Sequence, residues 1–491
     1  MAYLDTAAEG HVTGSPSVAA HVALSFDRLR AEAESWAASR DLIGKRPRND
    51  GRDPRAEVRP GPGAWPFLGH VLALQRRPLA LLDSLPTHGD LVEIRLGPKP
   101  AFVICHPDLA RQVLTDLRGF DRTGMVYERV RTAMGNGLAS AAHRDHRRQR
   151  LVMQPAFRHE HLRGYVAVMR QEITATMENW HDGDRVDLVD EMFTLTTTIA
   201  LRALFSSHLD PTQAERLRRA FDTFLRGIYT RAVLPLAGRL PTPGNRRYTR
   251  AVATWRAQVS DLIEGYRQSG ADRGDLMSRL LAARDEEDQG LSDTELADQV
   301  AVLMLAGGET TSAAVTWSWH LLTTHPDILE AVHTETDAVL GGDVAGWDHL
   351  PHLDLTARVV REALRLYPPA WVLPRTCTRP TTLAGRTLPP GTMVVFSPYI
   401  LHRRPGQYPH PTRFDPARWL APTPEHRISY LPFGAGATRC IGEEFGLAEA
   451  TLILASTAAR WNLSPDSSTP VLPAARAVLV PRAFPVHLSA R

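Results

Sequence analysis

Residues 431–446 read LPFGAGATRCIGEEFG, which places Cys440 in a glycine-rich turn just before apolar residues at helical spacing. Two kinds of chemistry fit such a turn. Backbone amides of a glycine-rich turn at a helix N-terminus bind phosphate groups, whereas a cysteine held as a thiolate binds a metal ion. The function of the chain depends on which of these applies.

The turn matches neither of two phosphate-binding templates. A dinucleotide-binding fingerprint needs G-x-G-x-x-G after a strand, but Gly434 and Gly436 are followed by Arg439 at the third position. A P-loop needs glycine and lysine followed by serine or threonine, and the turn contains no such run. The turn is therefore not predicted to bind phosphate.

A thiolate site fits the same residues better. Gly434 and Gly436 carry no Cβ, so their backbone can approach a flat cofactor closely. The free amides and the dipole of the following helix favour a thiolate at Cys440. A buried cysteine without a chemical role is the simpler explanation of this segment taken alone, so the rest of the sequence decides between the two.

Phe433, Gly436, Cys440 and Gly442 form the pattern F-x-x-G-x-x-x-C-x-G, which resembles the haem-binding loop of the cytochrome P-450 family. In that family a cysteine thiolate is the axial ligand of the haem iron and favours cleavage of the O–O bond. The resemblance implies that Cys440 is this ligand. It also implies haem contacts from Phe433, Gly434, Gly436, Thr438 and Gly442.

One position departs from the family pattern. The family usually has arginine or histidine two residues before the cysteine, as a contact to a haem propionate, and this sequence has Thr438 there. Arg439 is displaced by one position. Either Thr438 makes a weaker contact or Arg439 reaches the haem by another route.

A long apolar helix is expected after Ser292, which opens a capping-box pattern. Gly307 and Gly308 interrupt it, although each glycine costs about 1 kcal/mol relative to alanine in a helix. The run AGGETT resembles the family's A-G-x-D/E-T-T motif, where the helix is distorted above the haem and leaves room for O₂. The resemblance implies that Glu309 and Thr310 bind oxygen by hydrogen bonds and deliver protons.

The run REALRLYPP places Glu362 and Arg365 three residues apart, on one face of a helix. A surface ion pair at this spacing would contribute little to stability. The family, however, has an E-x-x-R pair at this place, closed by a later arginine, and PTRFDPARW supplies Arg418. The resemblance implies that the three form a buried structural network beneath the haem-binding loop.

In the run HRRQRLVMQPAF, His146 and Arg150 resemble the family's W/H-x-x-x-R helix, whose side chains hold haem propionates. Arg375 falls where another propionate-binding arginine is usual. Cationic donors suit such carboxylates. We expect a solvated basic face, and a candidate docking face for an acidic redox partner, at the neighbouring residues Arg144, Arg147 and Arg148.

Apolar residues occupy the positions that the family places over the haem. These candidates for the substrate pocket are Met125, Val126, Tyr127, Met304, Ala306, Trp371, Val372 and Leu373. They include no charged anchor, which favours a terpenoid or another specialised metabolite over a carboxylate substrate. Plain core packing is the alternative for several of them.

Composition excludes several classes of protein. The formal charge is +3, from 57 basic and 54 acidic residues, which gives no reason to expect nucleic-acid binding. Three separated cysteines argue against a disulfide scaffold and favour a reducing, cytoplasmic location. The apolar run 300–308 is far shorter than the roughly 20 residues that span a bilayer. We therefore expect neither a membrane anchor nor a secretory signal.

The chain of 491 residues divides into two parts. Residues 1–57 end in a charged segment rich in proline and glycine, and partial disorder is expected there. Residues 58–491 are expected to form one mainly α domain with small β-sheets, with strands near 90–106 and 382–397. The resemblance implies the cytochrome P-450 fold, a triangular prism with haem between the Glu309 helix and the Cys440 helix. We expect a monomer.

The function that the resemblance implies is O₂-dependent monooxygenation of an apolar small molecule by hydroxylation, epoxidation or multistep oxidation. The cofactor would be haem b. The chain ends about fifty residues after Cys440, without room for a fused flavin reductase. Electrons would come from NAD(P)H through separate proteins, a ferredoxin and its reductase.

Three alternatives remain open. A peroxide-driven fatty acid peroxygenase would replace the acid–threonine pair by an arginine, and Glu309 with Thr310 argues against it. A haem-thiolate sensor would need no proton relay. A zinc hydrolase is the weakest alternative, because histidine pairs such as His143 and His146 occur without an H-E-x-x-H motif.

Overall fold

Apolar residues repeat at helical spacing through most of the chain between the two strand-rich regions, and helices form there in the computed structural model. The structure describes residues 59–205, 211–233, 242–466 and 468–491. The extension expected at residues 1–57 lies outside this part of the chain. The domain boundary at residue 57 therefore stays a prediction.

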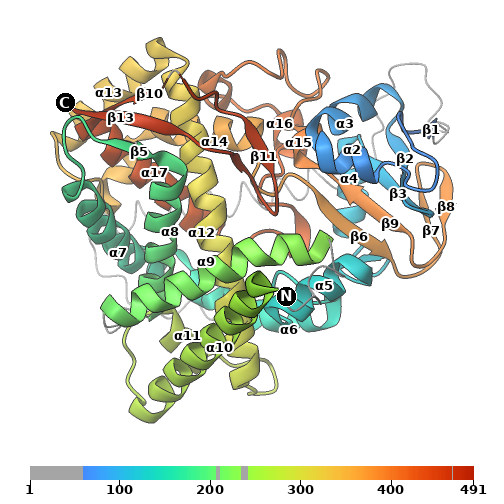
Figure 1. The fold of residues 1–491 in the computed structure, drawn as a ribbon, viewed down its shortest axis with the longest axis horizontal. Helices are drawn as coiled ribbons and strands as arrows, with labels where there is room; N and C mark the ends of the chain where they lie inside the picture. The colour runs from blue at the N-terminus through green and yellow to red at the C-terminus, as the bar shows by residue number, and fades with distance from the viewer. Residues whose placement is uncertain (1–58, 206–210, 234–241, 467) are drawn as a thin grey trace, which may run out of the picture. The chain divides into compact units, whose positions relative to one another are not determined.

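Helices make up most of the described chain. In chain order they are α2 (Val71–Arg76), α3 (Pro78–Ser84), α4 (Pro107–Thr115), α5 (Gly124–Met134), α6 (His143–Met153), α7 (His159–Glu178), α8 (Leu188–Phe205), α9 (Pro211–Val233), α10 (Pro243–Ser269), α11 (Leu276–Ala282), α12 (Asp293–Thr323), α13 (Pro326–Leu340), α14 (Asp354–Leu366), α15 (Pro398–Leu401), α16 (Pro424–Ser429) and α17 (Glu443–Arg460) (Figure 1). Within the described ranges, none of them is both long and apolar enough to cross a membrane.

The strands form one larger sheet and three small ones. The larger sheet has the order β1 (Arg59–Pro60), β2 (Leu91–Leu96), β3 (Lys99–Ile104), β9 (Met393–Phe396), β6 (Leu373–Cys377) and β4 (Phe120–Asp121). The smaller sheets are β10 (Trp461–Pro465), β13 (Pro485–Ala490) and β5 (Arg185–Asp187), the pair β7 (Thr381–Leu383) and β8 (Arg386–Leu388), and the pair β11 (Pro473–Ala475) and β12 (Leu479–Pro481).

Both strand-rich regions of the sequence form the expected strands. The runs DLVEIRLG and AFVICH become β2 and β3, an antiparallel pair in which Leu91 lies opposite Ile104. The second region gives the hairpin β7–β8 and then β9, which pairs in parallel with β3. The expected mainly α fold with small sheets is confirmed.

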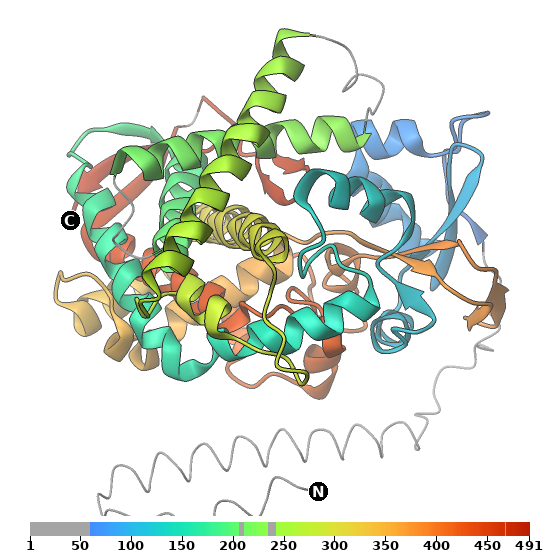
Figure 2. The same cartoon turned by 90° about the horizontal axis from the view of Figure 1, so that it is seen from below.

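Helix α12 passes through the middle of the helical part of the molecule (Figure 1; seen nearly end-on in Figure 2). Its first turn has the predicted capping box, because the Ser292 hydroxyl accepts from the Glu295 amide and the Glu295 carboxylate accepts from the Ser292 amide. Helical structure continues without a break through Gly307 and Gly308. Buried residues lie on all its sides, as expected for a central helix.

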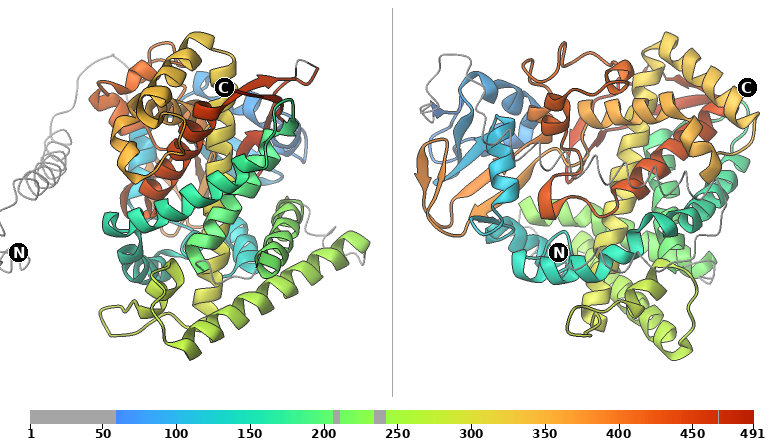
Figure 3. Two further views of the ribbon diagram at one scale, coloured as in Figure 1. Left: turned by 90° about the vertical axis from the view of Figure 1, so that its left-hand side faces the viewer. Right: turned by 180° about the vertical axis from the view of Figure 1, so that it is seen from behind.

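Two tryptophans fix the C-terminal half of α12. The Trp317 indole stacks on Tyr367 with 3.9 Å between ring centroids and donates to the Leu479 carbonyl at 3.0 Å. The Trp319 indole donates to the Thr457 hydroxyl of α17 at 3.1 Å. Helices α12 and α17 therefore keep a fixed separation, and Figure 3 (right) shows them side by side.

Candidate active site

A cavity of about 310 Å³ lies between α12, the loop before α17 and the sheet strands β6 and β9. Helix α12 contributes Leu303, Ala306, Gly307, Thr310, Thr311 and Ala314 to its wall. The loop contributes Pro432, Phe433, Gly434, Thr438, Cys440, Ile441 and Gly442. Further lining residues include Arg122, Tyr127, Pro369, Ala370, Leu373, Arg375 and Phe396. The motifs singled out in the sequence thus meet at one place.

The cysteine loop is folded back on itself by backbone hydrogen bonds. The Cys440 amide donates to the Phe433 carbonyl at 2.8 Å. Gly434 and Gly436 have φ of 71° and 64°, which residues with a Cβ rarely adopt. A Cβ on Gly436 would also lie 3.1 Å from the Leu114 carbonyl. The glycines are therefore required by the path of the loop.

The sulfur of Cys440 has its accessible surface toward the cavity. Burial raises the pKa of the thiol, while a hydrogen bond from the Gly442 backbone and the cations Arg150 and Arg439 lower it. Burial is the largest of these effects because a charged thiolate is poorly solvated there. A cation bound to the sulfur would offset that cost.

Helix α12 turns Thr310 toward the cavity and Glu309 away from its wall. The Thr310 hydroxyl donates to the Ala306 carbonyl one turn earlier. Burial raises the pKa of Glu309 to about 7. The positive charge of Arg476 opposes this increase, and the negative charge of Asp222 adds to it. Its Oε2 atom is buried without a hydrogen-bond partner among the described residues.

A second carboxyl group lies buried beside the same helix. Glu449 of α17 is 0% exposed, and neither of its oxygens has a hydrogen-bond partner within the described chain. Burial raises its pKa to about 8, and the interaction with the Thr311 side chain opposes this increase. Sequence analysis did not single out Glu449, because an isolated glutamate in a helical segment carries no pattern.

Two arginines line the cavity near Tyr127. Arg375 donates to the Tyr127 hydroxyl at 3.0 Å and to the Pro374 carbonyl at 2.8 Å. Arg122 donates to the Leu138 carbonyl at 2.8 Å, and burial together with repulsion from Arg375 lowers its pKa to about 10. No carboxylate in the described ranges forms an ion pair with either guanidinium. Arg122 was not predicted from the sequence, because an isolated arginine carries no local pattern.

His146 and Arg150 are not part of the cavity wall. They line a neighbouring cavity together with His143 and Ala437. Arg150 donates to the Arg439 carbonyl at 2.5 Å. Burial lowers the pKa of His146 to about 3, with help from the surrounding cations. The bond from Arg150 supports the loop, and His146 lines the same neighbouring cavity.

Thr438 and Arg439 point in different directions. Thr438 lines the cavity, and its hydroxyl lies 3.4 Å from the Ala435 carbonyl. The Arg439 guanidinium pairs with Glu443 at 2.5 and 2.7 Å, and its side chain is 59% exposed. The structure therefore places Thr438, and not Arg439, on the cavity wall.

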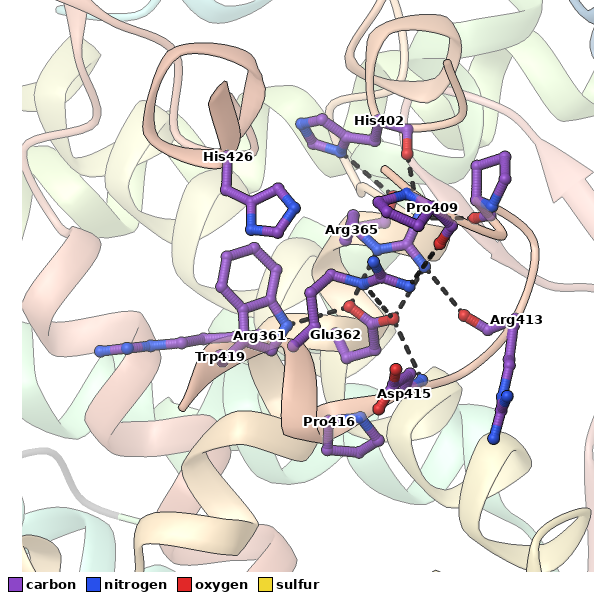
Figure 4. Close-up of polar contacts among 12 residues, drawn as sticks. Arg361, Glu362, Arg365, His402, Pro409, Arg413, Asp415, Pro416, Trp419 and His426 are labelled. Carbon is purple, nitrogen blue, oxygen red and sulfur yellow. Dashed lines mark hydrogen bonds and ion pairs between the residues drawn. The ribbon is translucent and has the colours of Figure 1, made fainter. Parts of the chain in front are cut away.

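Glu362 and Arg365 are both 0% exposed and form the centre of a hydrogen-bonded network (Figure 4). The two are joined by bonds of 2.7 and 2.8 Å. Glu362 also accepts from the Trp419 indole at 2.9 Å and the Asp415 amide at 3.1 Å, while Arg418 lies 3.5 Å away. Arg365 donates further to the backbone carbonyls of His402, Pro411 and Arg413. The structure brings the three predicted residues together.

The model of the cytochrome P-450 family matches residues 59–485. The chain belongs to this family. A crystal structure of the cytochrome P-450DA haem domain superposes with a TM-score of 0.79 at 26% identity, covering 88% of this chain and 98% of that one. The expected cytochrome P-450 fold is confirmed, and the chain is an enzyme of the monooxygenase class.

Three curated relatives share 44% identity with this cytochrome P-450. Pentalenene oxygenase of Streptomyces avermitilis aligns over 88% of this chain and 97% of its own length. Cyclooctatin synthase of Streptomyces melanosporofaciens aligns over 84% of this chain and 91% of its own. Cyclooctat-9-en-7-ol 5-monooxygenase of the same organism aligns over 83% and 90%.

The residues of this cytochrome P-450 fit the haem-thiolate group of the family. A cysteine sulfur faces the cavity, and Gly434 and Gly442, which have no side chain, lie on its wall. Arg375 is buried and Arg122 is partly buried, and neither has a carboxylate partner in the described ranges, as two propionates would require. No cluster of three or more histidine, cysteine or carboxylate side chains there could hold a metal ion, so the zinc alternative finds no site.

The candidate substrate residues of this cytochrome P-450 divide into two groups. Tyr127, Ala306 and Leu373 line the cavity. The others are not part of the wall formed by the described residues. Met125 and Val126 are 43% and 37% exposed, whereas Met304 and Trp371 are buried. Val372 packs against a hydrophobic core cluster. A helical or extended segment presents only some of its residues to one cavity, so runs of adjacent apolar residues could not all line it.

Proposed function

We propose that this cytochrome P-450 is a terpenoid monooxygenase that inserts one oxygen atom of O₂ into a cyclic, mostly hydrocarbon substrate. The observation that carries this proposal is the apolar wall that faces Cys440. Residues such as Leu303, Ala306 and Leu373 form it, without a charged side chain on α12. The printed names of the three relatives at 44% identity support the same substrate class.

Each candidate side chain then has a defined task. Cys440 supplies a sulfur ligand from the loop. Arg122 and Arg375 bind the carboxylates of the cofactor, which is haem b. Arg150 holds the loop through the Arg439 carbonyl, and His146 lies in the neighbouring cavity with it. When bound, the haem supplies the activation of dioxygen and the oxidation of the substrate.

The chain itself supplies protons to the dry side of the cavity. Thr310 holds a proton at its Oγ1 atom, which lies on the wall. Glu309 has a pKa raised to about 7 by burial, so its carboxyl group both gains and loses a proton near neutral pH. We assign the transfer of protons toward the cavity to Glu309 and Thr310.

Electrons come from NAD(P)H through a separate ferredoxin and its reductase. The exposed basic residues of α6 beside the cysteine loop, such as Arg144 and Arg147, support docking of an acidic partner there. A cytoplasmic location agrees with Cys105, Cys377 and Cys440 all being free thiols. We also propose that the enzyme is a monomer.

The absorption spectrum of the reduced, carbon-monoxide-bound protein tests the cofactor assignment. A thiolate ligand shifts the Soret band far from its position with histidine. We expect this shift in the parent protein and in a Cys377→Ser control, whose cysteine lies outside the cavity. Cys440→Ser should lose the shift. A shifted band that survives in Cys440→Ser would refute the role of this cysteine.

Optical titration tests the substrate class. Cyclic terpene hydrocarbons should expel water from the cavity and change the spin state of the haem iron, whereas fatty acids of similar size should not. Saturation with acidic ligands alone would contradict the proposal and favour the peroxygenase alternative.

Replacing Thr310 distinguishes a monooxygenase from a haem-thiolate sensor without turnover. Thr310→Ala should keep substrate binding but release a larger share of the electrons as peroxide, because the proton held on the cavity wall is lost. Unchanged product formation per NAD(P)H oxidised would contradict the task assigned to Thr310.

A further inference from the structure

Helix α8 packs against α12 at the two glycines of the AGGETT run. A Cβ on Gly307 would lie 3.2 Å from the Cβ of Ala200. A Cβ on Gly308 would lie 2.8 Å from the Thr197 hydroxyl, closer than real atoms of this kind approach. The glycines therefore allow α8 to pack directly against the backbone of α12.

One hydrogen bond crosses this contact. The Thr196 hydroxyl of α8 is 0% exposed and lies 2.8 Å from the Gly308 carbonyl of α12. The same hydroxyl is 2.9 Å from the Met192 carbonyl in its own helix. A threonine inside a helix usually donates to the carbonyl four residues earlier, but its single proton here also has an acceptor on the neighbouring helix at the shorter distance.

The Gly308 carbonyl belongs to the peptide unit that carries the amide of Glu309. The Glu309 side chain has little to hold it, because its Oε2 atom is buried without a hydrogen-bond partner in the described ranges. The direction of this side chain is then set by its backbone. Thr196 is the side chain that donates from α8 to that backbone.

We propose that Thr196 is a positioning residue for the oxygen-activating turn of α12. Its bond to the Gly308 carbonyl fixes the peptide before Glu309 and thereby the direction from which Glu309 and Thr310 deliver protons. This inference rests on the tasks proposed above for Glu309 and Thr310. Thr196 itself is not on the wall of the cavity and touches no reacting atom.

Substitutions at Thr196 can separate the hydroxyl from the volume of the side chain. Thr196→Val keeps the shape and removes the donor, whereas Thr196→Ser keeps the donor. Thr198→Val is the matched control, since Thr198 is partly exposed on the same helix and donates only within α8, to the Thr194 carbonyl at 2.8 Å. Thr196→Ala removes the donor with less bulk and replaces Thr196→Val if that variant does not bind haem.

Two measurements on the haem-loaded proteins test the inference. The first is amide hydrogen exchange in the peptide that covers residues 307–313, which needs no turnover. The second is product formed per NAD(P)H oxidised, with a terpene that binds. For Thr196→Val we expect exchange and uncoupling to increase about three- to tenfold, the size expected for one lost neutral hydrogen bond. Thr196→Ser and Thr198→Val should stay within about twofold of the parent protein.

The outcomes are distinguishable. Unchanged exchange and coupling in Thr196→Val would overturn the inference, and so would equal losses in Thr196→Val and Thr196→Ser, because the hydroxyl would then not be the cause. If the parent protein oxidises no terpene, the proposed function fails. In that case unchanged hydrogen exchange in Thr196→Val would still overturn the positioning of the turn.

Discussion

Two buried groups of ionisable side chains in this cytochrome P-450 differ in how their polar atoms are hydrogen-bonded. In the network below the cysteine loop, both oxygens of Glu362 accept hydrogen bonds and Arg365 donates to Glu362 and to three backbone carbonyls. Beside α12, Glu309 and Glu449 have buried carboxyl oxygens without partners within the described chain. The carboxyl oxygens of the first group all have hydrogen-bond partners, whereas these buried oxygens of the second group do not.

We propose that the difference reflects a different role for each group. A fully bonded buried ion pair holds its charges permanently, because removing a proton or a partner leaves an uncompensated charge. A buried carboxyl without partners has a raised pKa and exchanges its proton near neutral pH. The network at Glu362 therefore maintains the structure below the loop, while the groups beside α12 are suited to carrying protons.

The largest effect is expected from breaking the satisfied network. Glu362→Ala leaves the Arg365 guanidinium buried without its anion, which should destabilise the fold by about 3–5 kcal/mol. Thermal unfolding and the yield of haem-loaded protein measure this loss. Arg163→Ala, at an ion pair whose members Arg163 and Asp348 are 70% and 81% exposed, is the control and should cost about 0–1 kcal/mol. Equal stability of the two variants would refute the comparison.

The next effect concerns a group without partners. Glu309→Gln cannot give up or take up a proton, so turnover should fall about 100-fold. The ionisation near pH 7 that burial imposes on Glu309 should also disappear from the pH–rate profile. Rates measured from pH 5.5 to 8.5 test this, with Glu309→Asp as the variant that keeps a carboxyl group. A profile that is unchanged in Glu309→Gln would show that this carboxyl does not carry the proton.

A smaller effect is expected at Glu449, and it depends on pH. Burial raises its pKa in the folded protein to about 8 from an ordinary value of 4.5. Between these values the unfolded chain loses the proton and the folded protein keeps it, so stability falls as pH rises from about 4.5 to 8. Glu449→Gln should remove this pH-dependent loss of stability. Melting temperatures at pH 5 and pH 8 measure it, and parallel changes in both proteins would contradict it.

The smallest effect is expected at Arg439, and it tests which arginines bind the haem propionates. Arg439 forms an exposed ion pair with Glu443 and does not line the cavity, so Arg439→Ala should change stability by less than about 1 kcal/mol. Haem transfer to apomyoglobin should stay within about twofold of the parent rate. Arg122→Ala should release haem faster than Arg439→Ala. The reverse order would favour the alternative in which Arg439 reaches a propionate.

The sequence was informative where function depends on fixed spacing within one segment. The loop around Cys440, the turn at Glu309 and Thr310, and the pair Glu362 and Arg365 could all be identified, because each pattern lies within a single turn or helix. The alternating strands β2 and β3 were predictable for the same reason.

The residues that sequence analysis missed depend on contacts between distant segments. Arg122 reaches the cavity because β4 pairs with β6, more than 250 residues later. Thr196 and Glu449 gain their importance from helices α8 and α17 packing against α12. No local pattern distinguishes such residues from ordinary polar positions. The same limit applies to Met125 and Val126, which precede Tyr127 in sequence but do not share its place on the wall.

The two indole bonds of α12 have a consequence for how substrates of different size are accommodated. Any sliding of this helix along its axis would break both the bond from Trp317 to β12 and the bond from Trp319 to α17. These two bonds therefore hold the second half of α12 in place along its axis. If a larger substrate binds, we expect the cavity wall to move at the half of α12 before Gly307 and at the segments that face this half.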